Sequence, residues 1–142
     1  MTGNRSNLSS LKAALVYFGM VFAVGFLLGA IRVPLLVPRL GVRMAELLEM
    51  PLMLIAIYLA AGLVVRRYGA VVHGKFWLLA GFIAFDLMVS AEVVLARLLT
   101  GRSIGEYVTD RDPVSGSVYL VMLVIFGLMP WLRILQATGK PR

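Results

Sequence analysis

The chain has 142 residues, of which 61% are hydrophobic, and its mean hydropathy is +0.92. A water-soluble domain of this size cannot hide so much apolar surface, because small domains leave a large share of their surface exposed. The absence of cysteine excludes disulfides, thiolate metal sites and cysteine nucleophiles. The net charge of +7 does not indicate nucleic-acid binding, because no basic stripe with interleaved aromatic residues accompanies it.

Four stretches have the length of about 20 predominantly apolar residues that a helix needs to cross a bilayer. They cover residues 13–31, 45–65, 76–99 and 118–135. We therefore predict an all-α polytopic membrane protein, with a single integral membrane domain over 1–142 and a bundle of about four transmembrane helices. The first apolar run is too long for a signal-peptide core and no A-x-A site follows it, so we expect it to be retained.

The connection over residues 32–43 is expected to be irregular. It contains Pro34 and Pro38, and proline disfavours the helical conformation in the residue that precedes it. We therefore predict an extended loop or a short re-entrant turn between the first and second helices.

Two later connections carry helix-start signals. Ser103 and Glu106 have the spacing of a capping box, which predicts a short interfacial helix. Asp112 precedes a proline and is expected to cap the fourth helix. Pro130 lies near the end of that helix and should bend it.

Basic residues predict the orientation of the chain in the membrane. The two tails and the middle connection share one side and hold eight basic residues and no acid: Arg5, Lys12, Arg66, Arg67, Lys75, Arg133, Lys140 and Arg142. The other two connections hold six, accompanied by acids: Arg32, Arg39, Arg43, Arg97, Arg102 and Arg111. We therefore predict a bacterial inner-membrane protein with both termini cytoplasmic. Four aromatic residues are expected at the inner membrane boundary: Tyr68, Phe76, Trp77 and Trp131.

Small residues spaced four apart are expected to let the helices approach one another closely. Such pairs occur on three of the predicted helices: Gly25 and Gly29, Gly19 and Ala23, Ala56 and Ala60, Ala80 and Ala84. We expect contacts within one chain, with oligomerisation as the alternative.

One acid is expected in the middle of a membrane-spanning helix. Asp86 lies ten residues after Phe76, which is ~15 Å along a helix, or about half of a ~30 Å hydrocarbon core. A charged residue there costs about 2.5–3.5 kcal/mol on insertion scales. One face of this helix carries polar groups at its foot, centre and top: Lys75, Asp86, Ser90 and Arg97. Either Asp86 is a proton or cation site beside Ser90, or it is a neutral acid that hydrogen-bonds a neighbouring helix.

Four further charged residues are expected near the other membrane boundary: Glu46, Glu49, Glu92 and Arg32. The positive end of the second helix dipole favours Glu46 and Glu49 at its start. Alternatively, the three glutamates and the arginines before them form an ion-pair network, or line the mouth of a pathway towards Asp86. Glu92 lies about 120° around the helix from Asp86, which disfavours a paired-carboxylate centre.

The sequence predicts a small multi-pass membrane protein without enzymatic activity of its own, acting as an oligomeric channel or proton-coupled transporter around Asp86. The alternative is an accessory or scaffold subunit of a larger membrane complex, in which the buried charges pair with a partner. A less favoured third class is a membrane enzyme acting on a lipid or a quinone. The expected partners are membrane lipids and either copies of the chain or another membrane protein, with no cofactor, metal or nucleic acid; His73 is interpreted as a polar loop residue.

Overall fold

The computed structural model describes residues 2–139, which are almost entirely helical. The elements are α1 (Thr2–Ile31), the π-helical segment η1 (Arg32–Leu36), α2 (Val37–Tyr68), α3 (Phe76–Thr100), α4 (Ile104–Thr109) and α5 (Pro113–Thr138). The predicted all-α class is confirmed. Each of the four long helices contains one of the predicted apolar segments and extends beyond it.

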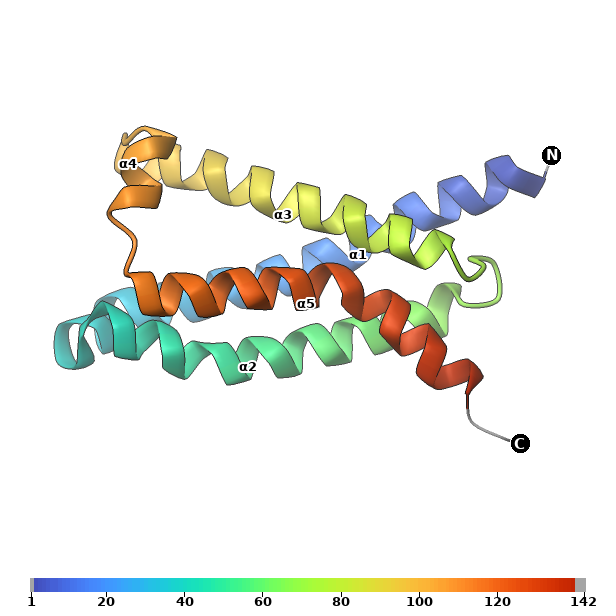
Figure 1. Cartoon of the computed structure of the whole chain (residues 1–142), viewed down its shortest axis with the longest axis horizontal. Coiled ribbons are helices and arrows are strands. Elements are labelled where there is room, and N and C mark those ends of the chain that lie inside the picture. The colour runs from blue at the N-terminus through green and yellow to red at the C-terminus, as the bar shows by residue number, and fades with distance from the viewer. Residues whose placement is uncertain (1, 140–142) are drawn as a thin grey trace.

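The four long helices lie side by side and alternate in direction along the chain (Figure 1). Helices α1 and α5 each pack against both α2 and α3, so α1 and α5 are diagonal to each other in the bundle. The two chain ends and the α2–α3 connection lie at one end, which we call the termini end. The η1 turn and α4 lie at the opposite end, the α4 end.

The segment between α1 and α2 is helical. The prediction of an extended loop over residues 32–43 is therefore wrong. Arg32–Leu36 form a π-helical turn, and the helix that follows is interrupted at Gly41, with φ 78° and ψ 165°. Pro34 and Pro38 supply no N–H group, so the regular hydrogen-bond ladder is disturbed there and a wider turn takes its place. The backbone conformation of Gly41 is accessible almost only to glycine, so this interruption depends on that residue.

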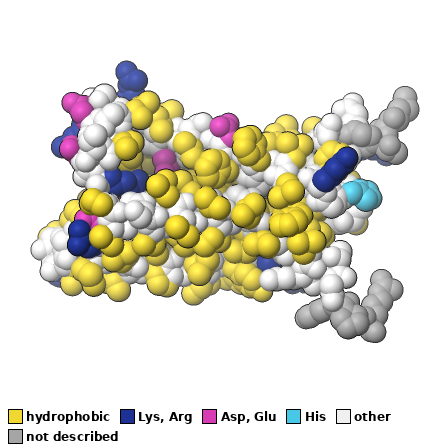
Figure 2. Space-filling model, viewed as in Figure 1, with side chains coloured by type: hydrophobic (Ala, Val, Ile, Leu, Met, Phe, Trp, Pro, Cys, Tyr) yellow, Lys and Arg dark blue, Asp and Glu magenta, His cyan; other side chains and the backbone are white. Residues whose placement is uncertain are grey.

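Three continuous helical stretches are long and apolar enough to cross a membrane: Asn4–Tyr68, Phe76–Thr100 and Pro113–Thr138. The first of them comprises α1 and α2, which pack against each other as the two arms of a hairpin. Hydrophobic side chains cover most of the middle of the visible face, while charged side chains concentrate towards its ends (Figure 2). These helix lengths and hydropathies are those of a small multi-pass membrane protein.

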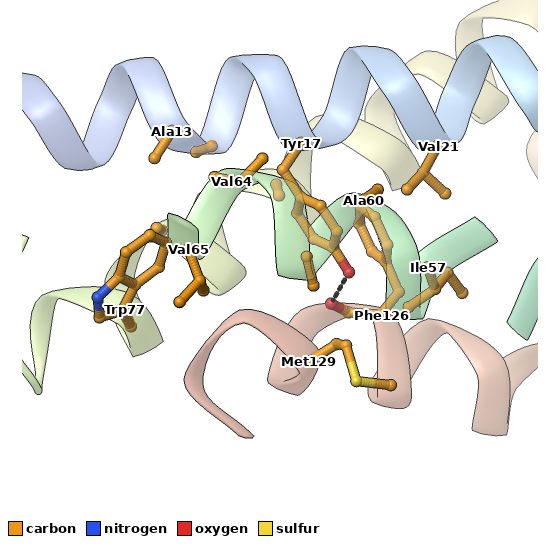
Figure 3. Close-up of a cluster of buried hydrophobic side chains, with 14 of the residues drawn as sticks. Ala13, Tyr17, Val21, Ile57, Ala60, Val64, Val65, Trp77, Phe126 and Met129 are labelled. Carbon is orange, nitrogen blue, oxygen red and sulfur yellow. Dashed lines mark hydrogen bonds between the residues drawn. The ribbon is translucent and has the colours of Figure 1, made fainter. Parts of the chain in front are cut away.

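The space between the four helices is filled by side chains from all of them (Figure 3). The largest fully buried side chains include Tyr17 of α1, Trp77 of α3 and Phe126 of α5. The indole N–H of Trp77 donates to the carbonyl oxygen of Val72 at 3.0 Å. Trp77 is therefore a core residue that ties the α2–α3 connection to α3. It lies in the first turn of α3, at the predicted end of that helix, but its side chain faces the interior of the bundle.

A buried hydrogen bond connects the diagonal helices α1 and α5. The hydroxyl of Tyr17 donates to the carbonyl oxygen of Phe126 at 2.7 Å, and the two rings stack with centroids 4.6 Å apart (Figure 3). In an α-helix this carbonyl accepts from the N–H four residues later, but that residue is Pro130, which has none. Tyr17 thus satisfies the carbonyl that the proline leaves free, in the segment where α5 bends (Figure 1).

Helices α3 and α5 approach most closely at two glycines. A Cβ atom added to Gly81 would overlap the backbone carbonyl of Gly127, so the two helices meet backbone to backbone. By contrast, nothing lies within 4 Å of a Cβ added to Gly19 or Gly29. The glycine spacing on α1 therefore does not mark a close crossing inside this bundle, whereas the isolated Gly81 does.

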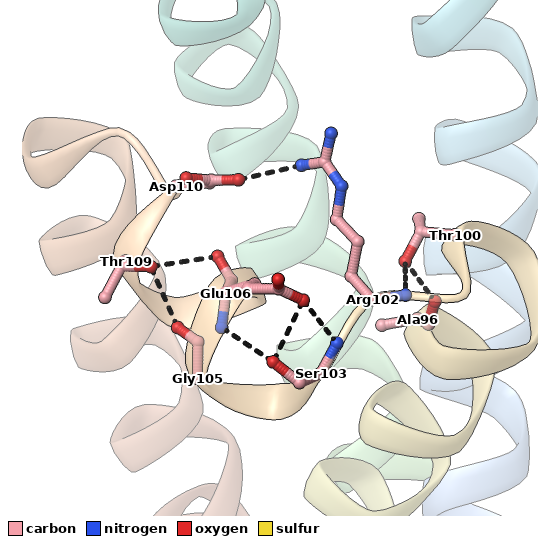
Figure 4. Close-up of polar contacts among 8 residues, drawn as sticks. All are labelled: Ala96, Thr100, Arg102, Ser103, Gly105, Glu106, Thr109 and Asp110. Atoms are coloured by element: carbon pink, nitrogen blue, oxygen red, sulfur yellow. Dashed lines mark hydrogen bonds and ion pairs between the residues drawn. The ribbon is translucent and has the colours of Figure 1, made fainter.

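Both predicted helix starts are confirmed at the α4 end. The Ser103 side chain accepts from the Glu106 N–H, while the Glu106 carboxylate accepts from the Ser103 N–H at 2.8 Å, completing the capping box of α4 (Figure 4). The Asp112 carboxylate accepts from the Ser115 N–H at 2.9 Å and caps α5. These local interactions fix the loop that closes this end of the bundle.

Candidate functional site

Asp86 lies in the middle of α3 with its side chain exposed on the outside of the bundle. The residues of α3 that face the core are Trp77, Ala80, Gly81, Ala84 and Met88. Asp86 makes no hydrogen bond or ion pair with any other residue between 2 and 139. The alternative of a neutral acid bonded to a neighbouring helix of the same chain is therefore not what the structure contains.

Phe82 and Ser90 lie one turn before and one turn after Asp86, and both are exposed. We call these three residues the α3 outer face. Lys75, also exposed, lies at the foot of the same stripe, and Arg97, half-buried, lies near its top. The polar stripe predicted from the helical period thus points away from the core.

An apolar groove runs beside this face, between α3 and α5. It has a volume of about 340 Å³ and is lined by Leu78, Phe82, Phe85, Val124, Gly127 and Leu128. Gly127, which lines the groove, has no side chain to fill it, and the backbones of α3 and α5 meet there at Gly81. The groove and the α3 outer face share Phe82, so an apolar surface adjoins the exposed carboxyl.

The other predicted site residues have partners within the chain, nearer the α4 end. Arg32 forms an ion pair with Glu49, with 2.8 Å between Nη1 and Oε2. The Ser115 hydroxyl donates to the Glu46 carboxylate at 2.5 Å and joins α5 to α2. These contacts are made with side chains of η1 and α5. The predicted place of the two glutamates in the first turn of the second helix is wrong, because α2 begins at Val37 and has no acid in its first turn.

Among the described arginines before Glu46, only Arg32 pairs with one of the three glutamates of the predicted network. Arg43 instead binds the carboxylate of Asp112, with Nη2 2.8 Å and Nε 3.0 Å from the same oxygen. Asp112 is also the cap of α5, so one acid holds both the helix start and the α2 side chain. Arg39 is exposed and forms no ion pair with a described residue.

Glu92 belongs to a second group of contacts, between α3 and α5. It accepts a hydrogen bond from the Tyr119 hydroxyl. The guanidinium of Arg111 lies 4.0 Å from the centre of the Tyr119 ring, and donates to the hydroxyl of Tyr107 at 3.3 Å. Cation–π stacking and the hydrogen bonds hold α4 and the start of α5 against α3.

Of the other predicted site residues, only Ser90 lies beside Asp86 in the structure. Glu92 lies six residues further along α3 and points towards α5, while Asp86 points outward. No described contact connects Asp86 to Arg32, Glu46 or Glu49. An exposed carboxyl and a separate polar cluster at the α4 end are thus two features, and the pathway between them remains a prediction.

Acid should weaken the contacts of Asp112. Hydrogen bonds from Arg43, and then from the Ser115 N–H, hold the pKa of this carboxyl well below its usual range. Its stabilising contribution is present above the unfolded-state pKa of about 3.9 and is lost as the pH falls through the lower folded value. We expect the melting temperature in detergent to fall more steeply below about pH 4 for the wild type than for Asp112→Asn. Parallel pH profiles of the two proteins would contradict this assignment.

The described histidine and acids lie in separate parts of the structure. His73 is exposed in the α2–α3 connection, as its interpretation as a loop residue requires. Within residues 2–139, no three side chains of the histidine, aspartate or glutamate type gather closely enough to hold a metal ion.

The sequence interpretation missed several residues that join the helices: Tyr17, Gly62, Gly81, Arg111, Ser115, Tyr119 and Gly127. Tyr17 had a usable signal, because Pro130 leaves a carbonyl free and a buried hydroxyl elsewhere is needed to satisfy it. Gly81 and Gly127 had none, because neither has a small residue four positions away.

The comparisons with known proteins do not place the chain in a family. It matches no protein-family model, and no curated protein or solved structure is significantly similar to it.

Proposed function

We propose that the chain is a non-enzymatic, multi-pass membrane subunit that docks against other transmembrane helices through the α3 outer face. The observation that carries this proposal is Asp86, an exposed carboxyl halfway along an apolar helix and without a partner among residues 2–139. In hydrocarbon such a group costs about 2.5–3.5 kcal/mol on insertion scales. A partner helix that supplies a cation or a hydrogen-bond donor at this depth recovers part of that cost.

The surroundings of Asp86 favour a docking surface. The neighbouring groove of about 340 Å³ is apolar and offers room for the side chains of an adjoining helix. The interior of the bundle is filled by large side chains such as Tyr17 and Phe126, which favours assembly on the outside over passage through the middle. Removing the charge of an exposed residue should also leave the fold intact.

The charge distribution supports an inner-membrane orientation with both termini cytoplasmic. The described basic residues of the termini end are Arg5, Lys12, Arg66, Arg67, Lys75 and Arg133, and no acid accompanies them. Six of the seven acids lie in α2, α3 and the segment from α4 to the start of α5, nearer the α4 end than Asp86. Positive charge is enriched in the short cytoplasmic segments of membrane proteins.

Purification in a mild detergent tests the docking proposal. We expect the wild type to carry a second membrane protein in constant stoichiometry and Asp86→Asn to lose it while keeping its melting temperature. Asp110→Asn is the matched control, because Asp110 is an exposed acid whose one ion-pair partner among the described residues is Arg102. A wild-type chain that purifies alone as a monomer, indistinguishable from Asp86→Asn, would refute the proposal.

A second candidate function is an oligomeric channel or proton-coupled carrier whose pathway runs between copies of the chain. The stripe formed by Lys75, Asp86, Ser90 and Arg97 favours it, because polar groups at both ends and in the middle could line such a pathway. It predicts a stable homo-oligomer and loss of flux in vesicles for Asp86→Asn. Equal flux in wild-type and variant vesicles eliminates this candidate.

A further inference from the structure

The side chain of Arg133 of α5 packs against Tyr58 and Gly62 of α2 at the termini end. Its guanidinium lies 4.1 Å from the centre of the Tyr58 ring, and Nη1 donates to the Tyr58 hydroxyl at 2.7 Å and to Gln136 at 3.0 Å. Gly62 makes room for it, because a Cβ at that position would lie 2.5 Å from Nη2. The side chain is therefore held in one place although it forms no ion pair with a described residue.

The same guanidinium keeps unused donors. Its Nε is buried and has no hydrogen-bond partner, and Nη2 donates to no described group. No carboxylate of residues 2–139 lies within ion-pair distance of Arg133. A guanidinium with free N–H groups and no counter-ion is suited to an anion that presents several oxygen atoms.

A second arginine follows Tyr58 and Gly62 on the same face of α2. Tyr58, Gly62 and Arg66 follow one another at intervals of four residues, so they share one face of α2. Arg66 is exposed and lies one turn, or ~6 Å, beyond Gly62 towards the end of the helix. The charged residues of the described segments at this end are all basic, so no acid there competes for either arginine.

We infer that Arg133 and Arg66 form a site at the α2–α5 seam for the phosphate of an anionic phospholipid headgroup. The phosphate accepts hydrogen bonds from Nη2 of Arg133 and from the Arg66 guanidinium. The acyl chains of the lipid lie along the apolar outer surface of the bundle. Tyr58 and Gly62 position the Arg133 guanidinium and do not themselves bind the lipid. The inference rests on the proposed membrane location but not on a docking role for Asp86.

Native mass spectrometry of the delipidated protein in detergent tests the site, with phosphatidylglycerol and phosphatidylcholine added in equal amounts. We expect a retained phosphatidylglycerol adduct on the wild type, weakened about ten-fold in Arg133→Gln and in Arg66→Gln. Arg39→Gln is the matched control, because it removes an exposed, unpaired arginine at the α4 end. Melting temperatures near the wild-type value are required of every variant compared.

Gly62→Ala separates a built site from general attraction to positive charge. It keeps every charge but forces the Arg133 guanidinium to shift from its place beside Tyr58, so we expect phosphatidylglycerol binding to weaken. Normal binding by Gly62→Ala, or equal losses in all variants including Arg39→Gln, would overturn the inference. Inorganic phosphate that binds with the same dependence on Arg133 and displaces the lipid would overturn the assignment to a headgroup. Insertion into phosphatidylcholine vesicles, measured separately, tests the membrane location.

Discussion

Gly81→Ala is expected to destabilise the bundle by about 1–3 kcal/mol or more, because the added methyl group overlaps the Gly127 carbonyl at the α3–α5 crossing. The obstacle is backbone, so no rotamer change relieves it and the two helices must move apart. Their separation also disturbs the packing of Phe85, which lines the same α3–α5 groove as Gly127. Thermal unfolding in detergent, followed by the loss of helical circular dichroism, measures the effect.

The matched control for this substitution is Gly29→Ala. Position 29 is helical and has nothing within 4 Å of an added Cβ, so only the higher helix propensity of alanine applies there. We expect Gly29→Ala to melt at or above the wild-type temperature. Equal melting temperatures for Gly81→Ala and the wild type would show that the two helices are not in backbone contact.

Tyr17→Phe is expected to destabilise the protein by about 1–2 kcal/mol, because it leaves the buried Phe126 carbonyl without a donor. The ring and its stacking are kept, so the loss reports on the hydroxyl alone. The size of the effect depends on Pro130, which prevents the backbone from supplying the missing N–H. Equilibrium unfolding in detergent measures it.

A double-mutant cycle with Pro130→Ala tests that dependence. Alanine at position 130 restores an N–H four residues after Phe126, so the carbonyl gains a second potential donor. We expect Tyr17→Phe to cost about 1 kcal/mol less in the Pro130→Ala background than in the wild type. Strictly additive effects of the two substitutions would refute the link between the proline and the tyrosine.

The helices and two of their caps could be predicted because they depend on local sequence. Runs of apolar residues and the Ser103–Glu106 spacing act within one element, and both are present in the fold. The turn between α1 and α2 could not be predicted, because the effect of proline on the preceding residue indicated a loop. The observed turn depends on a π-helical segment that accommodates the missing N–H groups of the prolines, and on the positive φ of Gly41.

The depth of Asp86 followed from counting residues, but its direction did not. In water an amphipathic helix reveals its buried side by its apolar stripe. In lipid the core-facing and the outward residues are both apolar, so α3 carries no such signal apart from the polar stripe itself. The partners of Glu46 and Glu92 lie 69 and 27 residues away in α5, and only the packing of the helices brings them together.

Cysteine accessibility tests most directly the central claim that α3 crosses a bilayer with Asp86 away from water. The chain has no cysteine, so single substitutions can be labelled without background. In sealed, oriented vesicles, a charged maleimide should label His73→Cys from one side and Arg102→Cys only from the other. Asp86→Cys should react only with a lipid-soluble reagent. Labelling of Asp86→Cys by the charged reagent as fast as His73→Cys would mean that the middle of α3 lies in water, and would contradict the account.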